Sequence, residues 1–181
     1  MKKFLLSSTL LLVALAARAQ GDVAEGELNY IFDHETMTAT VTQNRWWKEY
    51  GGGMGGQWHN TYEGDIVIPE TVGGYTVVAI GEQAFAGCKS LKGLSLPDSL
   101  ISIGSGAFRS CPALETVRFG SDLTYIGDGA FSYCGSFSEL ALPDSLVTLG
   151  NRAFYTDAAP ANPFVLHLGP SVRSVGEQAF A

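Results

Sequence analysis

The sequence is poor in basic residues, with 11 Lys and Arg against 18 Asp and Glu, and they form no basic stripe. A formal charge of −7 repels a phosphate backbone, so the composition argues against nucleic-acid binding. Beyond residue 16 the chain lacks an apolar run long enough to span a bilayer as a helix. Its 181 residues suit one domain with a continuous core.

Motifs of common catalytic and metal sites are also missing. The sequence has no CxxC and no G-x-S-x-G, and the glycine-rich run 51–56 lacks the Lys-Ser/Thr ending of a phosphate loop. His34, His59 and His167 are scattered, without the spacing of a zinc site. We therefore expect no enzyme activity, no catalytic residues, no cofactor and no metal.

The first 19 residues have the composition of a secretory signal peptide. Lys2 and Lys3 precede an apolar run over 4–16, and residues 17–19 have the A-x-A pattern of a cleavage site. No cysteine follows the run, which argues against a lipid-anchored form. Removing residues 1–19 deletes three basic residues and no acidic one, which changes the formal charge from −7 to −10. We expect a secreted protein in the periplasm, at the cell surface or outside the cell, not in the cytoplasm.

One five-letter sequence occurs twice. LPDSL covers 96–100 and again 142–146, a separation of 46, and Cys88, Cys111 and Cys134 follow one another at 23. Because 46 is twice 23, both observations report one repeat. A fixed period of this size indicates stacked structural units.

The repeat divides the chain after the signal peptide into two parts. Residues 63–181 hold five coils, the last incomplete, and residues 20–62 hold an N-terminal cap hairpin and an aromatic, glycine-rich loop. A single coil cannot bury its own apolar positions, so the coils must stack. The sequence thus predicts a one-domain solenoid.

The columns of the repeat predict the path of each coil. Apolar residues at the first, fourth and sixth positions, such as Leu91, Leu94 and Leu96, indicate a strand with one face inward. A Pro-Asp-Ser turn, a second extended piece, a corner glycine and an Ala-Phe pair follow. The glycine suits an unusual φ or a close backbone approach. We expect the phenylalanines to stack inside, with the cysteines as small buried groups. The corner glycines are Gly81, Gly104, Gly127, Gly150 and Gly176.

Acidic residues occur at one position of the turn that follows the first strand. Glu70, Asp98 and Asp144 share this position, where calcium binding is the alternative to turn chemistry. Ser121 and Pro170 interrupt the row, and calcium needs six or more oxygen ligands. We therefore expect these side chains to bond to nearby backbone.

The pattern LxxLxLPxSLxxIGxxAFxxC over 63–181 strongly resembles the BspA-like leucine-rich repeat family of bacterial surface proteins. The resemblance implies a leucine-rich-repeat solenoid, a right-handed superhelix rich in β-structure, with a parallel sheet on its concave side and short helical turns. It also implies a non-enzymatic exported protein that adheres to a host, matrix or neighbouring surface protein. Two departures are the long third coil and Asp157, which stands where the ladder requires cysteine.

The outward positions of the concave sheet are the first candidate binding surface, because solenoids bind partners on such faces. An ordinary solvated strand face is the alternative. Arg118, with Glu139 beside it, and His167 are the foremost candidates. The outward positions are Asp65, Val67, Gly93, Ser95, Thr116, Arg118, Glu139, Ala141, Val165 and His167. The candidate ligand-binding residues among them are Ser95, Thr116, Arg118, Glu139 and His167.

The two ends of the solenoid raise the question of capping. Residues 27–43 predict a hairpin, with strands at 30–32 and 38–42, that would cover the apolar end of the first coil. The other end stops at Ala181, part-way through a coil. We expect truncation there, with self-association through the uncapped coil as the alternative.

The aperiodic segment 44–64 is the second candidate binding surface. It carries Trp46, Trp47, Trp58 and Tyr50, and a loop this long tends to be functional or disordered. These rings could form a platform for a glycan or a protein partner. The alternatives are that the tryptophans plug the open end of the first coil, or that the whole protein is a structural spacer without a ligand.

Overall fold

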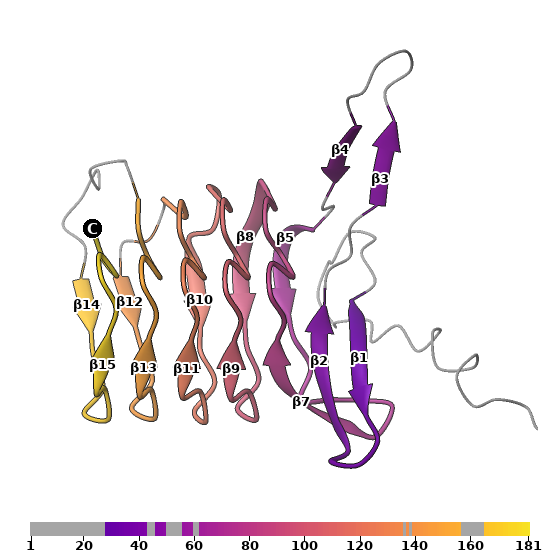
Figure 1. Cartoon of the computed structure of the whole chain (residues 1–181), viewed down its shortest axis with the longest axis horizontal. Coiled ribbons are helices and arrows are strands. Elements are labelled where there is room, and N and C mark those ends of the chain that lie inside the picture. The colour runs from indigo at the N-terminus through magenta and orange to yellow at the C-terminus, as the bar shows by residue number, and fades with distance from the viewer. Residues whose placement is uncertain are drawn as a thin grey trace, which may run out of the picture.

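The computed structural model describes residues 28–42, 46–49, 56–59, 62–135, 137, 139–156 and 165–181. The predicted signal peptide, Tyr50 and Asp157 lie outside these residues. None of the described residues belongs to a helix that is long and apolar enough to cross a membrane. The coils stack in one row, and the chain passes from coil to coil along it (Figure 1).

The N-terminal hairpin has the strands that the sequence predicts. β1 (Asn29–Asp33) pairs antiparallel with β2 (Thr38–Thr42). In the turn, Asp33 Oδ1 accepts a hydrogen bond from the backbone N–H of Glu35 at 2.9 Å. β2 also pairs in parallel with β7 (Tyr75–Ile80) of the first coil. The hairpin therefore continues a sheet of the solenoid.

The second extended piece of every coil enters one sheet, which we call the long sheet. Its order is β1-β2-β7-β9-β11-β13-β15, with β6 antiparallel to β7 (Figure 1). From β2 onward the path is parallel, and Ile80, Ile103 and Ile126 pair at equivalent positions. Its remaining strands are β6 (Thr71–Val72), β9 (Ser102–Ile103), β11 (Tyr125–Ile126), β13 (Thr148–Leu149) and β15 (Ser174–Val175).

The first strands of the coils form two smaller sheets, on the side that the sequence predicts to be concave. We call the two together the divided sheet. β5 (Glu63–Val67), β8 (Ser90–Ser95) and β10 (Thr116–Arg118) pair in parallel, and so do β12 (Glu139–Ala141) and β14 (Val165–His167). Parallel pairing between successive coils confirms the predicted solenoid.

The segment expected to be an aperiodic loop contains a second hairpin. β3 (Trp46–Glu49) pairs antiparallel with β4 (Gly56–His59), and both extend away from the row of coils (Figure 1). The expectation of a loop is wrong at these residues. Aromatic residues favour strands and pair well across a hairpin, so a segment can form strands without any repeat period.

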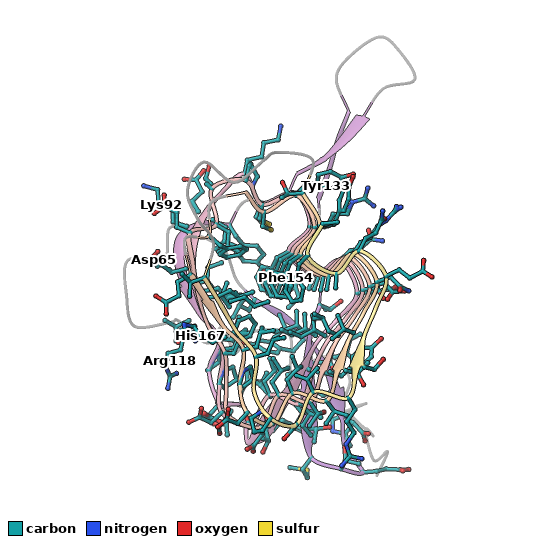
Figure 2. The ribbon with its side chains drawn as sticks, turned by 90° about the vertical axis from the view of Figure 1, so that its left-hand side faces the viewer. Asp65, Lys92, Arg118, Tyr133, Phe154 and His167 are labelled. Carbon is teal, nitrogen blue, oxygen red and sulfur yellow. The ribbon has the colours of Figure 1, made fainter. Side chains whose placement is uncertain are left out.

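A ladder of aromatic rings fills the core, as the sequence predicts. Successive ring centroids are 5.0, 5.0, 5.0 and 5.6 Å apart, and the rings are tilted by no more than 10° to one another. Tyr62, one period before Phe85, is buried and packs against that ring at 4.8 Å. Figure 2, a view along the row, shows Phe154 inside the coil. The ladder consists of Phe85, Phe108, Phe131, Phe154 and Phe180.

The cysteines form a second buried ladder beside the phenylalanines. Cys88, Cys111 and Cys134 are all buried and free of disulfides, which confirms their predicted role. The Sγ of Cys111 donates to the Phe85 carbonyl at 3.2 Å, and the Sγ of Cys134 to the Phe108 carbonyl at 3.1 Å. The hydrogen bond with Cys111 and burial raise the pKa of the Cys134 thiol, so it stays protonated at neutral pH.

The corner glycines allow successive coils to approach closely. None of them has a φ in the left-handed region. A Cβ at Gly104 would lie 2.7 Å from the Glu82 nitrogen, and one at Gly127 would lie 2.8 Å from the Ser105 nitrogen. Close approach is therefore the correct one of the two reasons that the sequence suggested. The path closes through single turns, such as the Ala84 N–H to Gly81 carbonyl bond at 3.3 Å.

Two of the three acids of the Pro-Asp-Ser column, Glu70 and Asp98, bond to backbone, as expected, but in the next coil. Glu70 accepts hydrogen bonds from the N–H groups of Asp98 at 2.8 Å and Ser99 at 3.3 Å. Asp98 in turn accepts one from the Ser121 N–H at 3.1 Å. These carboxylates link neighbouring turns, which supports turn chemistry over calcium binding.

Tyr30 of β1 carries a buried hydroxyl with no hydrogen-bond partner among the described residues. Leaving such a group unpaired costs about 1–3 kcal/mol, so we expect Tyr30→Phe to raise the free energy of unfolding, by about 1 kcal/mol. Chemical denaturation measures the change. Tyr75→Phe is the control: its hydroxyl lies 2.6 Å from His34 Nδ1, so that variant should lose stability. A loss of stability in Tyr30→Phe would contradict the expectation.

The same hydroxyl predicts the response of the protein to alkali. Burial raises the pKa of Tyr30 from the ordinary value of 10.0 to about 12. Above pH 10 the unfolded chain releases this proton while the folded chain retains it, so stability falls as the pH rises from 10 towards 12. We expect the free energy of unfolding of Tyr30→Phe to decrease less between pH 9 and 12 than that of the unmodified protein. Chemical denaturation at a series of pH values measures the difference.

Candidate functional site

The divided sheet brings the predicted outward residues into rows, because parallel strands pair equivalent positions. Thr116, Arg118, Glu139 and His167 are exposed, and Ser95 is half-buried. Figure 2 shows Asp65, Arg118 and His167 on one side of the coil. The rows are Asp65–Gly93–Thr116 and Val67–Ser95–Arg118 in one part, and Glu139–Val165 and Ala141–His167 in the other.

The charges on this face are arranged differently from the expectation. Glu139 Oε1 lies 3.4 Å from His167 Nε2, because β12 pairs with β14. Both side chains are more than half exposed, so this contact contributes little stability. Within the described residues, no ion pair or side-chain hydrogen bond involves Arg118. The face thus presents one free guanidinium on an acidic protein.

Gly93 brings two neighbouring side chains together on the same face. A Cβ at Gly93 would lie 2.5 Å from Asp65 Oδ1 and 3.1 Å from Thr116 Oγ1. The carboxylate and the hydroxyl therefore lie close over the glycine. Exposed polar side chains on neighbouring strands suit a macromolecular partner.

The hairpin β3–β4 brings the predicted tryptophans into one element, separate from the divided sheet. Trp47 pairs with Trp58 across the strands, and Trp46 pairs with His59. The whole element lies beyond the first coil (Figure 1). Tyr50, the fourth residue of this candidate surface, lies outside the described residues.

A groove of about 640 Å³, which sequence reasoning missed, runs along the turns after the corner glycines. We call it the turn groove. Arg109, Tyr133, Arg152 and Tyr155 contribute to its lining, and turns of four successive coils form it. Figure 2 places Tyr133 on the other side of the coil from Arg118 and His167. The groove and the divided sheet are therefore separate surfaces.

Planar side chains stack in the turn groove. The Arg109 guanidinium lies over the Tyr133 ring at 5.8 Å, and that of Arg152 over the Tyr155 ring at 5.5 Å. The two tyrosine rings meet edge to face at 5.7 Å. Arg152 Nε also donates to Gln178 Oε1 at 2.7 Å. A search of the turn columns for Arg and Tyr beside Gly and Ser could have found this site.

The structure offers no assembled metal site within the part of the chain that it describes. No three His, Cys, Asp or Glu side chains there come close enough to hold an ion. His34 Nδ1 lies 2.6 Å from the Tyr75 hydroxyl, His59 belongs to β4 and His167 contacts Glu139. The three histidines thus lie in different parts of the structure and do not form one site.

Solved structures with a similar fold come from several bacteria. A leucine-rich repeat protein of T. pallidum has a TM-score of 0.67 at 27% identity, covering 84% of this chain and 63% of its own. One from Bacteroides ovatus has 0.64 at 27%, covering 88% and 38%. One from Bacteroides capillosus has 0.58 at 26%, covering 82% and 100%. The chain thus spans less than two thirds of the first two. No curated protein sequence matches it.

The family model for the BspA type leucine-rich repeat region matches residues 59–181 in six copies. The predicted coils begin at residue 63 and number five, and Tyr62, one period before Phe85, lies in the additional matched residues 59–62. The match covers well over half of the sequence, and the parallel stacking of the coils agrees with it. The chain therefore belongs to the BspA-type leucine-rich repeat family.

Proposed function

We propose that the chain is an exported, non-enzymatic adhesion protein that binds a protein partner through the divided sheet. The observation that carries the proposal is Arg118, an exposed cation at the end of the row Val67–Ser95–Arg118, without a partner among the described residues. Leucine-rich repeat proteins of this family are interaction modules rather than catalysts, which supports the same function.

The physical basis is a rigid surface with one strong anchor. Each strand of the divided sheet is fixed by its neighbours, so the exposed residues lose little freedom when a partner binds. Arginine is enriched among residues that dominate binding energy. On a chain with a formal charge of −7, a lone guanidinium selects a partner that presents a carboxylate at that point.

Export supports the assignment of the partner. Residues 1–19 have the pattern of a signal peptide, and proteins of this family are typically exported or located at the cell surface. A secreted chain meets host, matrix or neighbouring surface proteins, and these are the proposed partners.

The test is a pull-down of host and matrix proteins with the purified protein, followed by affinity measurement on the captured partner. We expect Arg118→Glu to weaken binding by at least about tenfold, the effect of ~1.4 kcal/mol. Arg173→Glu makes the same change of charge at an exposed residue just before β15 of the long sheet and should leave affinity unchanged. Equal loss in both variants, or none in Arg118→Glu, would reject the divided sheet as the binding surface.

A further inference from the structure

The turn groove owes its hollow to two glycines that the backbone does not strictly require. The residue two positions after each corner glycine has a left-handed φ, between 52° and 59°. Gln83, Arg152 and Gln178 occupy this column with full side chains, whereas Gly106 and Gly129 leave its middle empty. A Cβ at Gly129 would meet Ser132 Oγ at 3.3 Å and no backbone atom within 4 Å. The hollow is therefore a matter of residue choice.

The charges that line the groove cancel. Arg109 and Arg152 are matched by Glu82 and Asp128, although the chain as a whole is acidic. Asp128 Oδ1 accepts a hydrogen bond from the Asn151 N–H at 2.7 Å, which holds the carboxylate in place. A charged ligand of either sign therefore gains no net attraction, and the groove favours a neutral ligand that bonds to both kinds of group.

Backbone groups of the groove are not free to receive a peptide strand. The N–H of Gly106 donates to the Asp128 carbonyl at 2.9 Å, and that of Gly129 donates to the Asn151 carbonyl at 2.8 Å. Strand addition needs unpaired main-chain groups, so these bonds exclude it along the floor of the groove. What remains for a ligand is a set of planar polar side chains and tyrosine rings.

We propose that the turn groove binds an uncharged oligosaccharide. The exposed Arg109 guanidinium can donate to two adjacent hydroxyls at once, and the carboxylate of Asp128 can accept through the oxygen that does not bond to Asn151. Tyr133 and Tyr155 combine an apolar ring with a hydroxyl, which suits the mixed surface of a sugar. The volume of about 640 Å³ lies within the range of ligand pockets, roughly 300–1,000 Å³. This site is independent of the proposed protein-binding surface on the divided sheet.

Isothermal titration of the purified protein with maltohexaose, cellohexaose, mannohexaose and chitohexaose, with a heparin hexasaccharide as the anionic comparison, tests the proposal. We expect at least one neutral sugar to bind and the heparin fragment not to. Gly129→Gln places in the groove the side chain that Gln83 and Gln178 carry in the same column, and should abolish binding. Arg109→Ala should weaken it by about 10–100-fold through lost charged hydrogen bonds. Arg109 is exposed, so this variant keeps the test valid if Gly129→Gln fails to fold.

Two controls separate the groove from the other surfaces. Arg118→Glu, on the divided sheet, should leave sugar binding unchanged, and so should the combined Trp46, Trp47 and Trp58→Ala variant. Sugar binding that survives in folded Gly129→Gln and Arg109→Ala but is lost in the tryptophan variant would place the ligand on the β3–β4 hairpin and overturn the proposal. Binding of the heparin fragment alone, or of no neutral hexasaccharide, would also overturn it.

Discussion

Replacing Phe108 with alanine should lower the free energy of unfolding by about 3–5 kcal/mol, the largest effect that we expect from a single substitution. The ring is fully buried and stacks between Phe85 and Phe131, with centroids 5.0 Å away on both sides. Its removal leaves a cavity that the neighbouring coils cannot fill, because their spacing is set by parallel strand pairing. Domains are stable by only about 5–15 kcal/mol, so the loss would be large in relative terms.

Urea or thermal denaturation followed by circular dichroism measures this loss, and Phe119→Ala provides the matched control. Phe119 is half-buried and meets Phe131 edge-on at 5.8 Å, outside the stacked ladder. We expect a clearly smaller cost there, because less apolar surface returns to water and no cavity forms. If Phe108→Ala cost no more than Phe119→Ala, the ladder would not be the main source of cohesion between coils.

Gly127→Ala should also be damaging, with a cost of about 1–3 kcal/mol. A methyl group here would stand 2.8 Å from the Ser105 nitrogen and 3.1 Å from the Ile103 carbonyl oxygen, both of the preceding coil. The Ile103 oxygen cannot move alone, because the Gly127 N–H already bonds to it at 2.8 Å. The two coils must therefore separate locally, which weakens the hydrogen bond from the Gly127 N–H to the Ile103 carbonyl.

Gly135→Ala is the control for this prediction. Gly135 is exposed, and a Cβ there would meet no atom within 4 Å. Such a change should alter stability by less than about 0.5 kcal/mol. Denaturation curves of the two variants, recorded side by side, give the comparison. Equal stabilities would mean that the coils tolerate a wider spacing than the corner glycines indicate.

Much of the fold follows from the repeat itself. The strands, the buried isoleucine and leucine columns, the phenylalanine ladder and the cysteine ladder are all predicted by the repeat, whose period of 23 residues lengthens to 26 over residues 137–162. Each of these features depends on contacts between equivalent residues of neighbouring coils. The repeat period therefore predicts which residues are in contact. The β1–β2 hairpin was also predictable, because alternation and turn residues are local signals.

The β3–β4 hairpin and the arrangement of the binding surfaces were not predictable in the same way. Glu139 contacts His167 rather than Arg118, because the strands of the divided sheet pair in two groups. Such a division leaves no trace in the repeat columns. The proposed protein-binding residues lie on two separate groups of strands, with Ser95, Thr116 and Arg118 in one and Glu139 and His167 in the other. Their charge pairing depended on which strands hydrogen-bond.

The sequence by itself determined that this chain is a stack of coils, which residues face the core and which lie on the strand faces. A period reports contacts between neighbours one repeat apart, and those contacts make the solenoid. Only the tertiary structure decided that the corner glycines serve close approach and that the turn groove exists. The groove takes Arg109, Tyr133, Arg152 and Tyr155 from three different coils and from three columns, of which Arg109 and Tyr155 share one. These side chains meet because each turn contains a left-handed φ and because the coils stack at a fixed spacing. Both are properties of the assembled stack and not of any one repeat.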